Sequence, residues 1–293
     1  MDFGRVMTAM ITPMHEDLSV NYEAAQELAA YLLDHGSDAL VVCGTTGESP
    51  TLTKDEKLKL FAAIHEVTKN RAMMIAGTSS YDTASSIELS KKAEAVGADA
   101  ILAVTPYYNK PPQEGLYQHF SAIADAVNLP VILYNVPSRT GCNILPKTCA
   151  VLAEHPNIVA IKEASGNISQ IAETAALVKG KMDIYSGNDD QIVPILSLGG
   201  KGVISVLSNV FPRETSEMCK AFFRGETEKS RDMQLDMLDL INALFCEVNP
   251  IPVKAAMAAM GYGENFLRLP LTPMEPEHEA NLLAIMRKHG LNV

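Results

Sequence analysis

The sequence has few of the features that place a protein in a membrane or outside the cell. No apolar run approaches the roughly 20 residues that a helix needs to cross a bilayer. The first five residues hold no basic segment followed by an apolar stretch, so no secretory signal is indicated. We therefore expect a cytoplasmic protein with no membrane partner.

Cysteine and histidine are too scattered for a metal site. The five cysteines include no C-x-x-C pair, and the seven histidines show neither H-x-x-x-H nor H-E-x-x-H spacing. The odd number and scatter of the cysteines indicate reduced thiols. We expect neither a metal nor another cofactor.

Positive charge is in deficit. The 24 Lys and Arg residues stand against 35 Asp and Glu residues, which gives a formal charge of −11. Such a surface repels phosphate backbones and anionic lipid headgroups, so nucleic acid is excluded as a partner. An anionic substrate would have to be held by local positive groups. The composition is otherwise ordinary, and the 293 residues fit one large domain or one domain with a small appendix.

Eight short apolar runs alternate with amphipathic stretches. The runs are continuously apolar, which is typical of parallel strands buried on both faces. They are Val6–Ile11, Ala39–Cys43, Ala72–Ala76, Ala100–Val104, Val131–Tyr134, Ile158–Ile161, Met182–Tyr185 and Gly202–Val206. This alternation predicts an α/β fold, a (β/α)8 TIM barrel. A doubly wound sheet is the alternative, but it would need a nucleotide fingerprint that the sequence lacks.

The amphipathic stretches predict helices. Those between the runs include Tyr22–Asp34, Lys54–Thr68, Thr83–Val96, Glu114–Ala126 and Ile168–Val178. A capping box, Thr53-Lys54-Asp55-Glu56, opens the second. After Arg224 the pattern becomes helical only, with helical spacing from Met233 to Val248 and helices over Val253–Met260 and Pro276–His289. We expect a catalytic barrel over residues 1–224 and a C-terminal helical region over 225–293.

Lys162 is the leading candidate for a catalytic group, because function gathers at the C-terminal ends of barrel strands. It closes the apolar run Ile158–Ile161, and burial favours the neutral form of an amine. A neutral amine can attack a ketone and form an imine. The alternative is a structural ion pair with Glu163 or another carboxylate, although the neighbouring Glu163 side chain should point to the opposite face of the strand.

The ends of two other runs, the second and the fifth, carry polar candidates. Tyr134 closes the fifth run, where its phenol could pass protons to a carbinolamine or simply pack as a core aromatic. The Gly-flanked pair Thr45 and Thr46 could bring hydroxyl and backbone N–H groups to a small carboxylate, and Thr45 could extend a proton relay. Arg139 follows the fifth run and could grip a carboxylate in bidentate fashion, or remain a solvated surface residue.

A glycine-rich segment, Leu198–Gly202, has two interpretations. Many barrels hold a phosphate near their seventh and eighth strands. A helix end followed by a tight entry into the eighth strand explains the same glycines.

With these residues identified, the sequence closely resembles the dihydrodipicolinate synthase family, within the N-acetylneuraminate lyase-like class I aldolases. The stretches that carry the resemblance extend through nearly the whole chain. They are Gly44–Ser49, Thr105–Pro111, Leu133–Thr140, Ile161–Asn167, Gly202–Val206 and Asn249–Lys254.

The resemblance implies condensation of pyruvate with L-aspartate 4-semialdehyde in lysine and diaminopimelate biosynthesis. Lys162 would form a Schiff base with pyruvate. The proton relay would comprise Tyr134, Thr45 and, from a neighbouring subunit, Tyr108. Thr46 would bind the pyruvate carboxylate in a pocket lined by Gly187 and Ile204, and Arg139 would hold the semialdehyde carboxylate. A homotetramer, built as a dimer of dimers, is also implied.

One departure from the family concerns feedback inhibition by lysine. Positions that hold histidine, asparagine and glutamate in lysine-inhibited members read Lys54, Lys57, Tyr81 and Ser85 here, whereas Ser49, Glu48 and Tyr107 remain compatible. Two added cations should repel the ammonium groups of lysine. We therefore expect weak or absent inhibition.

Two rival functions remain. A sister aldolase that acts on sialic acid or a sugar-derived aldehyde would share Lys162 and Tyr134, but it has no obvious use for Arg139 together with the Thr45–Thr46 pair. A regulator that only binds small acids would not need both the lysine and the tyrosine.

Overall fold

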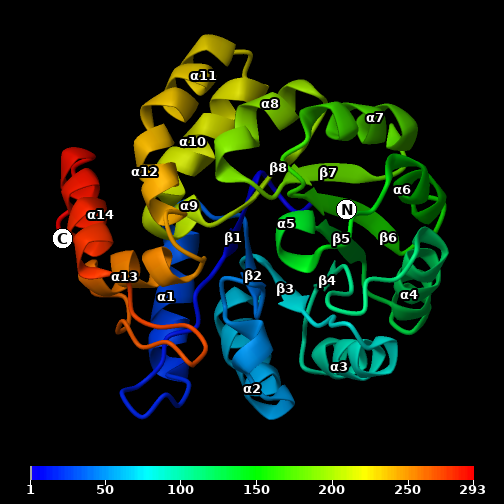
Figure 1. Cartoon of the computed structure of the whole chain (residues 1–293), viewed down its shortest axis with the longest axis horizontal. Helices are drawn as coiled ribbons and strands as arrows, with labels where there is room; N and C mark the ends of the chain where they lie inside the picture. Colours follow the sequence, from blue (N-terminus) through cyan, green and yellow to red (C-terminus); the bar gives the residue numbers. More distant parts are fainter. Residues whose placement is uncertain (1) are drawn as a thin grey trace.

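The eight apolar runs form eight parallel strands that pair in sequence order and close into a barrel (Figure 1). The computed structural model describes residues 2–293. The strands are β1 (Val6–Ala9), β2 (Ala39–Val42), β3 (Met73–Gly77), β4 (Ala100–Val104), β5 (Val131–Asn135), β6 (Ile158–Glu163), β7 (Asp183–Ser186) and β8 (Gly202–Ser205). The predicted (β/α)8 barrel is confirmed, and every predicted strand is present with its ends shifted by at most two residues.

Side chains of each strand alternate between the barrel interior and the helices outside, which is why both faces are apolar. Met7 and Ile204 belong to the buried cluster inside the barrel, whereas Val6 belongs to the cluster under the helices. Phe3 and Tyr185 meet edge to face at 6.4 Å inside the barrel and are both buried. Because Phe3 precedes β1, this pair fills the N-terminal end of the barrel and leaves the C-terminal end for a site.

A helix outside the barrel follows each strand (Figure 1). These helices are α1 (Tyr22–Asp34), α2 (Lys54–Thr68), α3 (Thr83–Ala95), α4 (Gln113–Asp125), α6 (Pro146–Leu152), α7 (Ile168–Val178), α8 (Ile192–Ser197) and α10 (Pro212–Phe223). The bounds predicted for α1, α2 and α7 agree with the structure. The predicted capping box at Thr53 is also confirmed, with Glu56 and Thr53 each bonded to the other's backbone N–H.

Short helical turns occupy several loops at the C-terminal end of the barrel. They are η1 (Ser49–Thr51), α5 (Pro137–Thr140), η2 (Asp189–Gln191) and α9 (Leu207–Val210). None of these was predicted, because three or four residues are too few to show a periodic pattern.

The C-terminal region is all helical, as predicted, and gathers on one side of the barrel (Figure 1). Its helices are α11 (Thr227–Asp236), α12 (Leu238–Leu244), α13 (Ile251–Ala259) and α14 (Pro276–Lys288). The helical spacing from Met233 to Val248 does not mark one helix, because the chain breaks at Met237 and Val248 is 56% exposed beyond α12. Across residues 2–293, no helix has the length and apolarity to span a membrane.

Candidate active site

Lys162 and Tyr134 lie side by side inside the barrel. The register of β5 and β6 pairs the two residues, and the Lys162 amine lies over the Tyr134 ring, 4.3 Å from its centroid. Both side chains are buried, at 5% and 6% exposed. The structure therefore brings together the two residues that strand ends alone had suggested.

Glu163 points away from Lys162, as predicted from the alternation of a strand. Its carboxylate is buried outside the barrel and accepts hydrogen bonds from Asn135 Nδ2 at 3.1 and 3.2 Å and from Ser165 N at 2.7 Å. Burial raises the pKa of Glu163, and these hydrogen bonds oppose the rise. The predicted alternative of an ion pair between Lys162 and Glu163 is wrong.

Gly187 leaves room for the lysine. A Cβ atom at this position would lie 3.0 Å from Lys162 Cγ and 2.7 Å from Ala164 Cβ, so any larger residue would displace the side chain. Ile204 belongs to the same interior cluster as Tyr134 and is 1% exposed. Both residues predicted to line the pyruvate pocket therefore lie inside the barrel, and Gly187 lies directly beside Lys162.

The loop after β2 carries Thr45 and Thr46 in a bent backbone. The residues that flank it, Cys43 and Glu48, have left-handed φ angles of 56° and 55°, which side chains other than glycine seldom adopt. Gly77 of β3 permits this path, since a Cβ there would lie 2.3 Å from the Cys43 carbonyl oxygen. The Gly-flanked loop predicted from the sequence therefore has a strained backbone at both ends.

Arg139 lies on α5, a single helical turn at the mouth of the barrel. Thr140 fastens this turn through its hydroxyl, which donates to the Val136 and Cys142 carbonyls and accepts from Thr105 Oγ1. The Arg139 side chain is exposed and donates from Nη1 to the Asn249 carbonyl at 3.4 Å. A guanidinium so placed keeps most of its donors free for a carboxylate.

Asn249 contacts two predicted substrate-binding residues. Its Nδ2 donates to Thr46 Oγ1 at 3.1 Å, and its carbonyl accepts from Arg139. The residue is 5% exposed, and its Oδ1 has no hydrogen-bond partner within the described residues. Asn249 begins one of the stretches that carry the family resemblance, but no role was predicted for it.

Glu48 is not part of an open pocket, contrary to its predicted compatibility with lysine binding. Its carboxylate accepts from Lys254 Nζ at 2.5 Å and from Arg268 N at 3.2 Å. The side chains of Lys254 and Glu48 are 0% and 1% exposed. The Arg268 guanidinium also binds Glu56 at 2.5 and 2.9 Å, which lowers the pKa of that carboxyl to about 2.

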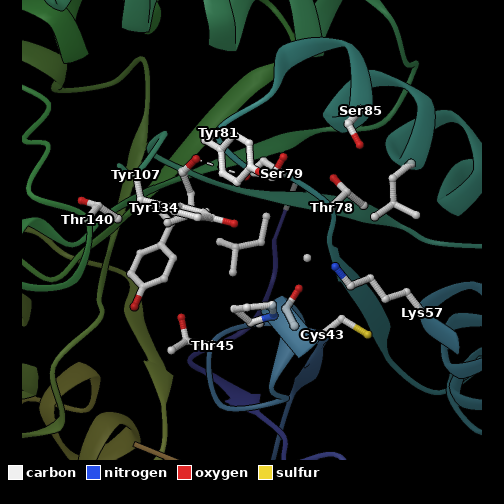
Figure 2. A pocket seen from close by; sticks show the side chains of 18 of the residues that line it. Cys43, Thr45, Lys57, Thr78, Ser79, Tyr81, Ser85, Tyr107, Tyr134 and Thr140 are labelled. Carbon is white, nitrogen blue, oxygen red and sulfur yellow. Dashed lines mark hydrogen bonds between the residues drawn. The ribbon is translucent and has the colours of Figure 1, made fainter. Parts of the chain in front are cut away.

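A cavity of about 500 Å³ opens beside these residues (Figure 2). Thr45, Tyr134 and Arg139 line it at the active-site side, and Lys57 points into it from the other side. Lys162 does not line this cavity, but its amine contacts the ring of Tyr134, which does. The volume suits small acids.

The positions expected to weaken lysine inhibition all line this cavity: Lys54, Lys57, Tyr81 and Ser85. Lys54 forms an exposed ion pair with Glu88 at 2.5 Å. Burial lowers the pKa of Lys57, and the neighbouring Cys43 thiol opposes this shift. The cation-rich lining predicted from the sequence therefore faces the cavity.

Tyr107 and Tyr108 are adjacent in the chain and differ in environment. Tyr107 lines the cavity and packs edge to face against Tyr81 at 5.2 Å, and burial raises its pKa. Tyr108 is 91% exposed with a φ of 68°. Within a single chain Tyr108 therefore does not join Tyr134 and Thr45.

The glycines of Leu198–Gly202 end a helix, as the second interpretation predicted. The N–H groups of Gly199, Gly200 and Lys201 donate to the carbonyls of Leu196, Ile195 and Ile184. The segment precedes β8, so it lies at the N-terminal end of the barrel, away from Lys162. The alternative of a phosphate site here is wrong, because the required backbone donors are already bonded.

Comparison with known proteins gives a consistent result. The model of the dihydrodipicolinate synthetase family matches residues 2–289. The chain is 55% identical to the 4-hydroxy-tetrahydrodipicolinate synthase of Lachnoclostridium phytofermentans over 97% of each chain.

Two solved structures are also similar over nearly the whole chain. A dihydrodipicolinate synthase from Cyanidioschyzon merolae with lysine bound has a TM-score of 0.96 and 44% identity, covering 99% of each chain. A monomeric dihydrodipicolinate synthase variant has a TM-score of 0.97 and 44% identity, covering 99% of this chain and 97% of the other.

Proposed function

The chain belongs to the dihydrodipicolinate synthetase family, and on that premise we propose that Lys162 is its covalent nucleophile. The chain is a lyase that condenses pyruvate with L-aspartate 4-semialdehyde to 4-hydroxy-tetrahydrodipicolinate in diaminopimelate and lysine biosynthesis. The observation that carries the proposal is the buried Lys162 amine, 4.3 Å from the centroid of the Tyr134 ring.

The reaction begins with attack of the Lys162 amine on the ketone carbon of pyruvate. The carbinolamine loses water and becomes a protonated imine, which acts as an electron sink. Loss of a methyl proton gives an enamine, whose carbon attacks the aldehyde of the second substrate. The amine of that substrate then displaces Lys162 and closes the ring, which regenerates the free lysine.

Proton transfer is assigned to Tyr134 and Thr45. Both line the cavity, and the Tyr134 ring contacts the Lys162 amine. A phenol at this position can deliver a proton to the departing hydroxyl of the carbinolamine and recover one later. We also assign Tyr108 to this relay, in the site of a neighbouring subunit, because its own chain leaves it 91% exposed.

The two carboxylates are assigned to separate groups. The Thr46 hydroxyl, next to Thr45, would bind the pyruvate carboxylate in the pocket formed by Gly187 and Ile204. The exposed Arg139 guanidinium, at the rim, would bind the carboxylate of the semialdehyde. This division supports the synthase over a sister aldolase for sugar-derived aldehydes, since a neutral sugar would leave Arg139 unused.

Three further assignments go with this function. We propose a homotetramer built as a dimer of dimers, because Tyr108 is free to reach another chain. We propose that residues 1–224 form the catalytic barrel, since α10 ends at Phe223, and that 225–293 form an appended helical region. Both substrates are small polar metabolites, and we expect the enzyme to meet them in the cytoplasm.

The decisive experiment is borohydride reduction in the presence of pyruvate, followed by peptide mass mapping. A stable adduct on Lys162 is expected, because reduction converts the imine into a secondary amine. Lys162→Ala should lose the adduct and nearly all turnover while retaining a cooperative thermal transition. Adduct formation at another lysine, or activity of the folded Lys162→Ala variant, would refute the proposal.

A parallel assay separates the rival functions. Pyruvate with L-aspartate 4-semialdehyde should turn over far faster than pyruvate with N-acetylmannosamine. A small-acid-binding regulator would give neither product nor adduct.

A further inference from the structure

The C-terminal region contacts the substrate-binding residues of the barrel through Asn249. This residue precedes α13 and is separated in sequence from Thr46 by 203 positions and from Arg139 by 110. Its side-chain amide donates to Thr46 Oγ1 at 3.1 Å, and its backbone carbonyl accepts from Arg139 Nη1 at 3.4 Å. One residue thus touches both groups assigned to the substrate carboxylates.

The bond to Thr46 sets the direction of its hydroxyl proton. A threonine hydroxyl has one donor and two acceptor sites, and the Asn249 amide occupies an acceptor site. The O–H is therefore directed away from Asn249 and is free to donate to a carboxylate. Thr46 is 2% exposed, so water offers little competition for this geometry.

The Lys254–Glu48 ion pair anchors both partners of that contact. Lys254 lies on α13, one helical turn beyond the chain segment of Asn249, and Glu48 ends the loop that carries Thr46. The two side chains are 0% and 1% exposed, with 2.5 Å between Nζ and Oε1. Arg268 N adds a second bond to the same carboxylate. The left-handed backbone of Glu48 is thereby held in place.

We propose that the C-terminal helical region is a positioning element for the active site, with Asn249 orienting the Thr46 hydroxyl toward the pyruvate carboxylate and the Lys254–Glu48 pair fixing the distance between them. This inference rests on the proposed function of Lys162 and Thr46. Asn249 and Lys254 act through other residues and are positioning residues.

The first test is Asn249→Leu, which keeps the side-chain volume and removes the amide donor. The KM for pyruvate should rise roughly tenfold or more, because a hydroxyl that is no longer oriented binds the carboxylate less well. The KM for the semialdehyde should stay unchanged, since the backbone carbonyl that contacts Arg139 is retained. A loss of structure alone would not separate the two substrates in this way.

A double-mutant cycle with Thr46→Val tests whether Asn249 acts through Thr46. Asn249→Leu should cause no further loss in the Thr46→Val background, because the group that it orients is already absent. The matched control is Asn157→Leu, a partly buried amide that bonds only the Ala124 and Val127 carbonyls. This control should leave both KM values unchanged.

The second test separates positioning from stability at the ion pair. Lys254→Met and Glu48→Gln each leave a buried group without its partner and should lower the thermal midpoint. The double variant is neutral and should recover the midpoint, but its kcat/KM for pyruvate should stay roughly tenfold or more below that of the parent. Lys181→Met with Glu154→Gln, an exposed pair, is the control and should change neither.

An unchanged pyruvate KM in Asn249→Leu, or full additivity with Thr46→Val, overturns the role of Asn249. Recovery of activity together with stability in the Lys254–Glu48 double variant overturns the role of the pair. Borohydride trapping at Lys162 should persist at saturating pyruvate in every variant, and its absence in the parent would instead refute the proposed function.

Discussion

Two neighbouring residues of β6 have opposite roles because successive side chains of a strand point to opposite faces. Lys162 enters the barrel and meets Tyr134, whereas Glu163 leaves it and accepts hydrogen bonds from Asn135 and Ser165. The alternation therefore directs the Glu163 carboxylate away from the Lys162 amine.

Sequence alone identifies residues such as Lys162 and Tyr134, because each interrupts or ends an apolar strand where barrel function gathers. Asn249 and Lys254 could not be assigned in this way. Their partners Thr46 and Glu48 lie 203 and 206 positions away, and only the tertiary structure brings them together. The sequence also could not show that Glu48 is buried in an ion pair with Lys254.

At the residue scale, we predict that L-lysine does not inhibit this enzyme appreciably. Lys54 and Lys57 line the cavity at positions where this sequence departs from the lysine-inhibited members of the family, and their charge repels the ammonium groups of L-lysine. Initial rates should stay unchanged in millimolar L-lysine, and Lys57→Met should increase any inhibition because it removes one cation. Half-maximal inhibition of the parent by sub-millimolar L-lysine would contradict this expectation.

At the scale of elements, the loop between β2 and α2 is held at both ends. The capping box of Thr53 begins α2, and Glu56 of that box also binds the Arg268 guanidinium. The start of one barrel helix is therefore tied to the C-terminal region. The same loop carries Thr45 and Thr46, so the loop that leads into α2 also forms one side of the active site.

We predict that Thr53→Ala lowers the free energy of unfolding by about 1 kcal/mol, because the N–H of Glu56 loses its capping acceptor. Denaturant titration would measure this change. Thr227→Ala, at the exposed first residue of α11, is the control and should change stability by less than about 0.5 kcal/mol. Equal effects of the two substitutions would show that the box contributes nothing specific.

The helices were predictable in proportion to their length. The 13 residues of α1 and the 15 of α2 show a full apolar stripe and were predicted with their ends. The short helix α8, with six residues, and α5, with four, give no periodic signal. Because α5 carries Arg139, the site was less predictable than the barrel that supports it.

At the scale of the whole molecule, Tyr108 points to assembly. An aromatic side chain that is 91% exposed beside the cavity residue Tyr107 is available to a second chain. The similar monomeric synthase variant shows that this fold can also exist without partners. Assembly therefore has to be measured together with activity.

We predict that Tyr108→Phe and Lys162→Ala chains, each nearly inactive alone, complement one another when mixed after reversible dissociation. A mixed dimer holds one site with both native residues, so about a quarter of the parent activity should return in an equal mixture. Sedimentation would confirm that the chains assemble. Full activity of Tyr108→Phe alone, or assembly without recovery, would exclude a shared site.

The Phe3–Tyr185 pair fills the N-terminal end of the barrel, so the active site opens only at the C-terminal end. Both substrates, the released water and the cyclic product therefore enter or leave through the same opening. With the roles proposed above, pyruvate binds deepest, at Lys162, and the semialdehyde binds near the rim, at Arg139. A semialdehyde molecule that binds first therefore blocks the access of pyruvate to Lys162. We therefore expect ordered binding in which pyruvate binds before the semialdehyde, and substrate inhibition at high concentrations of the semialdehyde.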